Sequence, residues 1–114
     1  MPHCIIEYAK ELEQTIAIPE LIERVHAGAV ACGLFQEADI KTRAIAYEYF
    51  RTGTGTDPFI HVTMKILSGR TQEQKKQATQ SVLNQLETLA VVPLSLTVEV
   101  RDMVRETYSK LVRG

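Results

Sequence analysis

Apolar and polar positions along this chain follow a strand pattern, then a helix pattern, then a strand pattern again. Residues 2–8 are rich in β-branched and aromatic side chains and predict a strand. Residues 19–32 have apolar side chains at helical spacing, with Pro19 suited to the first turn and Gly33 to the C-terminal cap. Residues 39–47 return to partial alternation, which completes a predicted β-α-β unit. The apolar faces consist of Cys4, Ile6 and Tyr8 in the strand and Leu21, Val25, Ala29 and Cys32 in the helix.

The same order of patterns occurs a second time. Alternation over 59–67 predicts a strand, and Gly69 ends it. Thr71 and Gln74 fit a capping box at the start of a helix, and Pro93 is expected to end that helix. The apolar stripe of this helix is Ala78, Val82, Leu86 and Leu89, and the last predicted strand covers residues 94–100.

These two passes indicate a duplicated β-α-β unit within one domain of residues 1–114. The pseudo-repeats cover about 2–50 and 59–103, and the Gly- and Thr-rich segment 51–58 is predicted to be the loop between them. Right-handed crossovers would give a four-stranded sheet with both helices on one face, an α+β fold.

The other face of that sheet has no predicted cover. Part of it is apolar, and a domain this small is more easily stabilised if the face packs against other subunits. We therefore expect an oligomer, in which the tail from Asp102 to Gly114 forms a short helix that docks on a neighbour.

The composition of the chain argues against several classes of function. Thirteen Lys and Arg against fourteen Asp and Glu leave a net charge of −1, which gives no overall field for nucleic acid or a membrane surface. Cys4 and Cys32 are too few for a disulfide framework and lack metal-ligand spacing with the three histidines, so no metal site is expected. No segment approaches the length of a membrane span, and a cytoplasmic protein with reduced thiols is the expectation.

The N-terminus offers candidate chemistry. Removal of Met1 would leave Pro2 with a free secondary amine, whose unperturbed pKa would lie at about 7.7–8.0. Burial and nearby cations disfavour the charged form, so such an amine can act as a general base near neutral pH. Position alone is a weak signal, because proline is a common second residue.

Three motifs strengthen that hypothesis. They are Pro2-His3 at the start of a strand, Ile-Lys-Thr-Arg at 40–43, and Met-Lys-Ile-Leu-Ser-Gly-Arg-Thr-Gln-Glu-Gln-Lys-Lys at 64–76. Together they resemble the tautomerase superfamily, and chain length and motif order most resemble its 5-carboxymethyl-2-hydroxymuconate isomerase family, over residues 2 to about 103. Arg70 falls on one arginine of the family pattern. Lys41 stands where the family has a second arginine, and Arg43 on the same strand face is the alternative source of a guanidinium.

The resemblance implies an isomerase that moves a proton and a double bond in 5-carboxymethyl-2-hydroxymuconate, in homoprotocatechuate or 4-hydroxyphenylacetate catabolism. Pro2 would be the base, while Arg70 and either Lys41 or Arg43 would bind carboxylates of a small anionic substrate and stabilise an enolate oxygen. It also implies a homotrimer that needs no metal or organic cofactor.

Two alternatives remain open. One is a related tautomerase acting on 2-hydroxymuconate or phenylpyruvate-like enols. The other is a non-catalytic trimeric binding module, which a retained Met1 would favour because Pro2 would then be an amide. His3 and His61 occupy equivalent repeat positions, so we expect a shared structural role for them.

Overall fold

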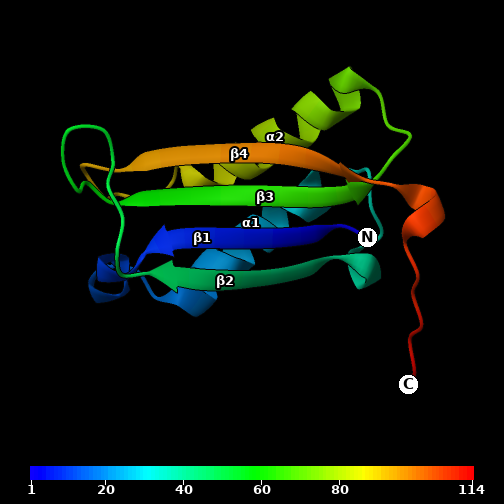
Figure 1. Cartoon of the computed structure of the whole chain (residues 1–114), viewed down its shortest axis with the longest axis horizontal. Helices are drawn as coiled ribbons and strands as arrows, with labels where there is room; N and C mark the ends of the chain where they lie inside the picture. The colour runs from blue at the N-terminus through cyan, green and yellow to red at the C-terminus, as the bar shows by residue number, and fades with distance from the viewer.

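The sheet places strands from both repeats side by side, in the order β2-β1-β3-β4 (Figure 1). The structure is a computed structural model and describes all 114 residues. Its strands are β1 His3–Ala9, β2 Lys41–Tyr47, β3 Phe59–Leu67 and β4 Ser95–Met103, and its α-helices are α1 Ile18–Ala31 and α2 Gln72–Leu86. Three short 3-10 helices are η1 Lys10–Gln14, η2 Glu37–Asp39 and η3 Arg105–Thr107.

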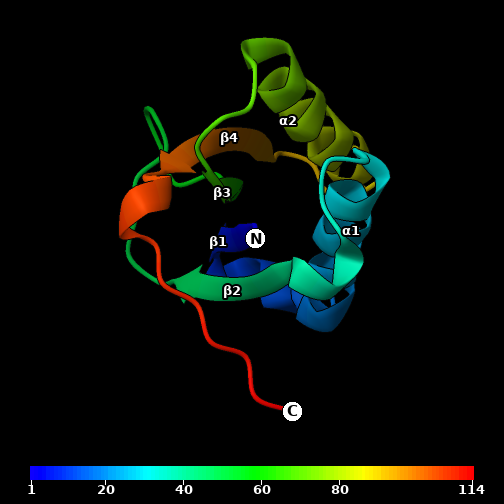
Figure 2. The same ribbon diagram turned by 90° about the vertical axis from the view of Figure 1, so that its right-hand side faces the viewer.

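Strand pairing confirms the duplicated β-α-β architecture. Within each repeat the two strands are parallel, β1 with β2 and β3 with β4, whereas β1 and β3 pair antiparallel in the centre. Both helices cover the same face of the sheet (Figure 2). This is the four-stranded mixed sheet with two helices that the sequence predicts.

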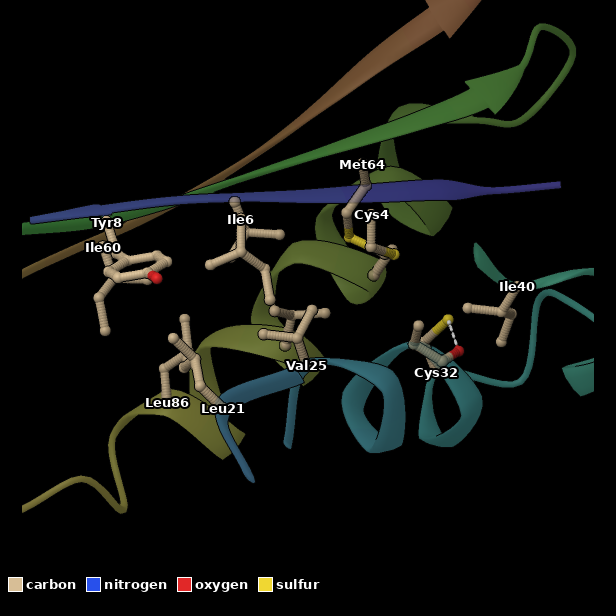
Figure 3. Close-up of a cluster of buried hydrophobic side chains, with 14 of the residues drawn as sticks. Cys4, Ile6, Tyr8, Leu21, Val25, Cys32, Ile40, Ile60, Met64 and Leu86 are labelled. Carbon is tan, nitrogen blue, oxygen red and sulfur yellow. Dashed lines mark hydrogen bonds between the residues drawn. The ribbon is translucent and has the colours of Figure 1, made fainter. Parts of the chain in front are cut away.

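The core lies between that face and the two helices. Alternate strand residues such as Ile6 and Val62 are fully buried there, and the helical stripes supply the facing side chains (Figure 3). The helices approach most closely at Gly28, where an added Cβ would lie 2.7 Å from the Val82 Cα atom. Ser81 Oγ donates to the Gly28 carbonyl at 2.7 Å across the same contact. Glycine here allows the two helix backbones to touch.

Helix α2 starts as predicted but ends earlier. The Thr71 hydroxyl accepts from the Gln74 N–H, and the Gln74 side chain accepts from the Thr71 N–H, so the capping box is confirmed. The helix ends at Leu86, not near Pro93. Thr88 Oγ1 donates to the Gln85 carbonyl at 2.7 Å, which offers the backbone an alternative to another helical turn. Leu89 therefore packs on the core from a loop.

Other boundaries also differ from the prediction. The second strand begins at Lys41 because residues 37–39 form η2, and the last strand extends to Met103. The tail helix expected over Asp102–Gly114 is limited to η3, and residues 108–114 have no regular structure. No helix in the fold is both long and apolar enough to cross a membrane.

The face opposite the helices is more polar than expected. Directly paired residues of neighbouring strands point to the same face, so the registers define rows of side chains across the sheet. The row at the N-terminal end of β1 contains three cations and a histidine: Lys41, His3, Lys65 and Arg101. Apolar side chains on this face include Ile5 and Ile45, in separate rows.

Candidate active site at the N-terminus

The start of β1 holds Pro2 inside the fold. Its side chain is fully buried, and its carbonyl accepts from the Lys41 N–H at 3.0 Å. That hydrogen bond fixes the start of β2 beside the start of β1. The N-terminus therefore lies at the end of the sheet where η2 and the C-terminal tail also lie (Figure 1).

Several charges surround the terminal amine. Burial lowers the pKa of the Met1 amine, the Asp39 carboxylate opposes that shift, and Lys110, Lys41 and Arg70 add to it. The charges of all four side chains therefore act on the Met1 amine. The structure brings Lys41 and Arg70 to the N-terminus, as the sequence predicts for two of its candidate residues.

Arg70 is held by the turn that follows α1. It comes directly after Gly69, whose φ of +123° favours glycine. One guanidinium nitrogen donates to the Leu34 carbonyl at 2.8 Å, and the guanidinium carbon lies 5.1 Å from the centroid of the Phe35 ring. A guanidinium has five N–H donors, so this anchoring leaves others available for a carboxylate. Leu34 and Phe35 lie outside the periodic segments, and no sequence signal marked them.

Arg43 is placed differently. Its guanidinium donates to His3 Nδ1 at 3.1 Å on the open face of the sheet, and His3 Nε2 lies 3.0 Å from the Tyr108 hydroxyl. Because arginine can only donate, neutral His3 carries its proton on Nε2. Burial lowers the pKa of His3, and Arg43 and Lys41 lower it further. Of the two alternatives for the second cation, Lys41 is the one that influences the terminal amine.

The C-terminal tail and η2 each add a charged side chain that the sequence analysis missed. Lys110 Nζ lies 3.0 Å from an Asp39 carboxylate oxygen. A surface depression beside this ion pair is lined by Ala38, Asp39, Lys41, Lys110, Leu111 and Val112. The basic character of the tail was visible in the sequence, but the sequence predicted only a short helix that docks on a neighbour.

Other reactive side chains are arranged unfavourably for chemistry. Burial raises the pKa of the Cys4 thiol to about 11, which keeps it protonated at neutral pH. His, Cys, Asp and Glu side chains form no group of three that could hold a metal ion. The N-terminal end of the sheet thus combines a desolvated amine with several cations, an arrangement suited to binding an anion and moving a proton.

Comparisons with known proteins identify the family of the chain. The sequence profile of the family described as 5-carboxymethyl-2-hydroxymuconate isomerase matches residues 2–111. A 5-carboxymethyl-2-hydroxymuconate Delta-isomerase from Escherichia coli is 28% identical over 90 residues, which cover 77% of this chain and 71% of that protein.

Solved structures share the fold. A 5-carboxymethyl-2-hydroxymuconate delta-isomerase superposes with a TM-score of 0.85 at 14% identity, over 98% of this chain and 89% of its own. The isomerase from Deinococcus radiodurans R1 gives 0.81 at 24% identity, over 98% and 90%. A fused 4-OT symmetric trimer gives 0.69 at 12% identity, over 96% and 93%. The profile match confirms the sequence resemblance: this chain belongs to the 5-carboxymethyl-2-hydroxymuconate isomerase family of the tautomerase superfamily.

Proposed function

We propose that the chain isomerises 5-carboxymethyl-2-hydroxymuconate, with the secondary amine of Pro2 as general base once Met1 has been removed. The observation that carries this proposal is that the charges of Lys41 and Arg70 act on the terminal amine of Met1, next to Pro2, whose pKa burial lowers. A neutral amine among cations can accept a proton at neutral pH and can attract an anionic substrate at the same time.

Proton transfer by Pro2 requires no change in the number of atoms. The amine takes the proton of the 2-hydroxyl group and returns it to a carbon of the conjugated system, so the enol becomes a ketone and the double bond moves. Negative charge develops on the enolate oxygen in between. Arg70 and Lys41 hold carboxylates and stabilise that charge, which is the kind of fixed electrostatic help that often dominates catalysis.

Lys41 is assigned as the second cation in preference to Arg43. Both side chains lie on the open face of the sheet, but the Arg43 guanidinium donates to His3, whereas the Lys41 N–H donates to the Pro2 carbonyl and the Lys41 charge lowers the pKa of the Met1 amine. Lysine is a point charge without the bidentate fork of arginine, so it contributes less geometric selectivity for a carboxylate.

Assembly as a homotrimer is part of the same proposal. It would place the open, partly apolar sheet face against other subunits, and one solved neighbour of this fold is a symmetric trimer. Sedimentation velocity tests this point, and a stable monomer at assay concentrations would contradict it. The family also supports a role in homoprotocatechuate or 4-hydroxyphenylacetate catabolism.

The decisive experiment is ultraviolet-monitored isomerisation of 5-carboxymethyl-2-hydroxymuconate and of 2-hydroxymuconate. The protein used should have its N-terminus confirmed as Pro2 by intact mass, and a fraction that retains Met1 serves as the matched control. We expect turnover of the first substrate by the Pro2 form only. Activity on 2-hydroxymuconate alone would keep the mechanism and change the substrate. Absence of turnover with both compounds would favour a non-catalytic binding module.

A further inference from the structure

The C-terminal tail returns to the end of the sheet where the chain begins. After η3 the tail passes the edge of the sheet near the N-terminus (Figures 1 and 2). Tyr108 packs edge-on against His3, with ring centroids 6.2 Å apart, and its hydroxyl lies 3.0 Å from His3 Nε2. This contact fixes the direction in which the next residues leave the sheet.

Lys110 follows two residues later and reaches η2. Its ammonium lies 3.0 Å from Asp39, and it shares a surface depression with Lys41. Two ammonium groups face one carboxylate there, so the depression has one positive charge in excess. An ammonium has three N–H donors, of which the Asp39 contact uses one.

The ion pair contributes little to holding the fold together. The Lys110 and Asp39 side chains are 37% and 42% exposed. Exposed pairs of this kind contribute little to stability, because solvent screens the charges. A functional effect of removing Lys110 can therefore be separated from a structural one.

The proposed substrate has three carboxylates, and 2-hydroxymuconate has two. Arg70 and Lys41 provide one cation for each carboxylate that both molecules share. We propose that Lys110 binds the third, the carboxymethyl carboxylate, and so selects the tricarboxylate over 2-hydroxymuconate. This inference rests on the proposed function. The apolar side chains of Leu111 and Val112 line the same depression and would lie against the carbon skeleton.

The test compares Lys110→Gln with wild type on both substrates. We expect the KM for 5-carboxymethyl-2-hydroxymuconate to rise about tenfold, as for loss of one charged contact. The KM for 2-hydroxymuconate and both kcat values should stay within about twofold of wild type, since the shared cations are untouched. Lys110→Arg should restore discrimination because it keeps the charge.

Arg113→Gln is the matched control, since it removes a charge from the same tail without altering any recorded contact of Lys110. Wild-type turnover of the tricarboxylate would uphold the proposed function. The inference would still be overturned if Lys110→Gln left the KM for the tricarboxylate unchanged, or if it lost equally on both substrates. Wild type that converts only 2-hydroxymuconate, or neither compound, would overturn both.

Discussion

The starts of β1 and β3 occupy equivalent places in the two repeats, at opposite ends of the sheet. At the first, the charges of Lys41 and Arg70 act on the terminal amine of Met1, the residue before Pro2. At the second, Phe59 packs against Phe50 and Tyr47, with ring centroids 5.1 and 6.1 Å apart. One end of the sheet is built for an anion and the other for aromatic packing, although the same strand, helix and strand form both.

The turns that leave the strands differ in the same way. After β3, Gly69 and Arg70 deliver a guanidinium to the end of the sheet that holds the N-terminus. After β1, the chain forms η1 and buries Leu12, which is 2% exposed, in the core. The duplication preserves the apolar positions that make the fold, whereas the charged positions have diverged. Within one subunit, the candidate-site cations therefore lie at one end of the sheet.

Replacing the proposed base should have the largest effect on activity. We expect Pro2→Ala to lower kcat/KM by about 10²-fold or more, since general base catalysis contributes about 10²–10⁴-fold. Phe59→Leu at the equivalent strand start should leave kcat near that of wild type. The ultraviolet assay measures both, with intact mass confirming each N-terminus. A near-normal rate for Pro2→Ala would remove Pro2 from the mechanism.

Arg70→Ala should have the next largest effect. We expect kcat/KM to fall about 10²-fold because the enolate oxygen loses a fixed donor. Arg51→Ala is the control, because Arg51 also donates to a single backbone carbonyl, that of Gly53, in the loop between the repeats. Equal effects of the two substitutions would show that Arg70 acts only on structure.

Much of the fold could be predicted because it depends on periodicity. The alternation of residues such as Ile60 and Val62, and the helical stripe through Leu21 and Val25, directly report which side chains are buried. The end of α2 could not be predicted this way. It depends on a local hydrogen bond of Thr88, and Pro93, five residues after Thr88, is the stronger sequence signal.

Residues of the candidate site were predicted only where a sequence motif contained them. Pro2 and Arg70 came from the resemblance, and the sequence left Lys41 and Arg43 as alternatives. Choosing between them needed the contact between Arg43 and His3, which depends on strand register. Asp39 and Lys110 were missed because 71 residues separate them, and no period connects a short 3-10 helix with an irregular tail.

A smaller effect, on stability alone, is expected where the two repeats touch. In Gly28→Ala the new Cβ would lie 2.7 Å from the Val82 Cα atom and 3.1 Å from the Ser81 carbonyl oxygen. Backbone atoms cannot move aside as a flexible side chain does, so the helices must separate. We expect overpacking to lower the free energy of unfolding by about 1–3 kcal/mol. The better helix propensity of alanine offsets about 1 kcal/mol of that loss. Urea denaturation measures the net change, with the exposed Glu23→Ala as control, and a stabilised Gly28→Ala would contradict the close contact.

The smallest expected effect is a change of stability with pH, and it involves two side chains on the open face of the sheet. Hydrogen bonds from Arg101 and then His61 lower the pKa of Glu99 below its usual 4.5, whereas burial and nearby cations lower the pKa of His3 below 6.5. A depressed carboxyl pKa adds stability that is present above pH 4.5 and is lost as pH falls through the folded pKa. A depressed histidine pKa destabilises the fold as pH falls below 6.5, because the unfolded chain takes up the proton more readily.

Titration of Glu99 and of His3 should therefore weaken the fold in different pH windows. Unfolding free energies measured by urea between pH 7 and 3 should show Glu99→Gln less stable than wild type at pH 7, with the difference shrinking below pH 4.5. His3→Gln should instead gain stability relative to wild type as pH falls below 6.5. A Glu99→Gln difference that stays constant down to pH 3 would show that the carboxylate gains nothing from Arg101 and His61.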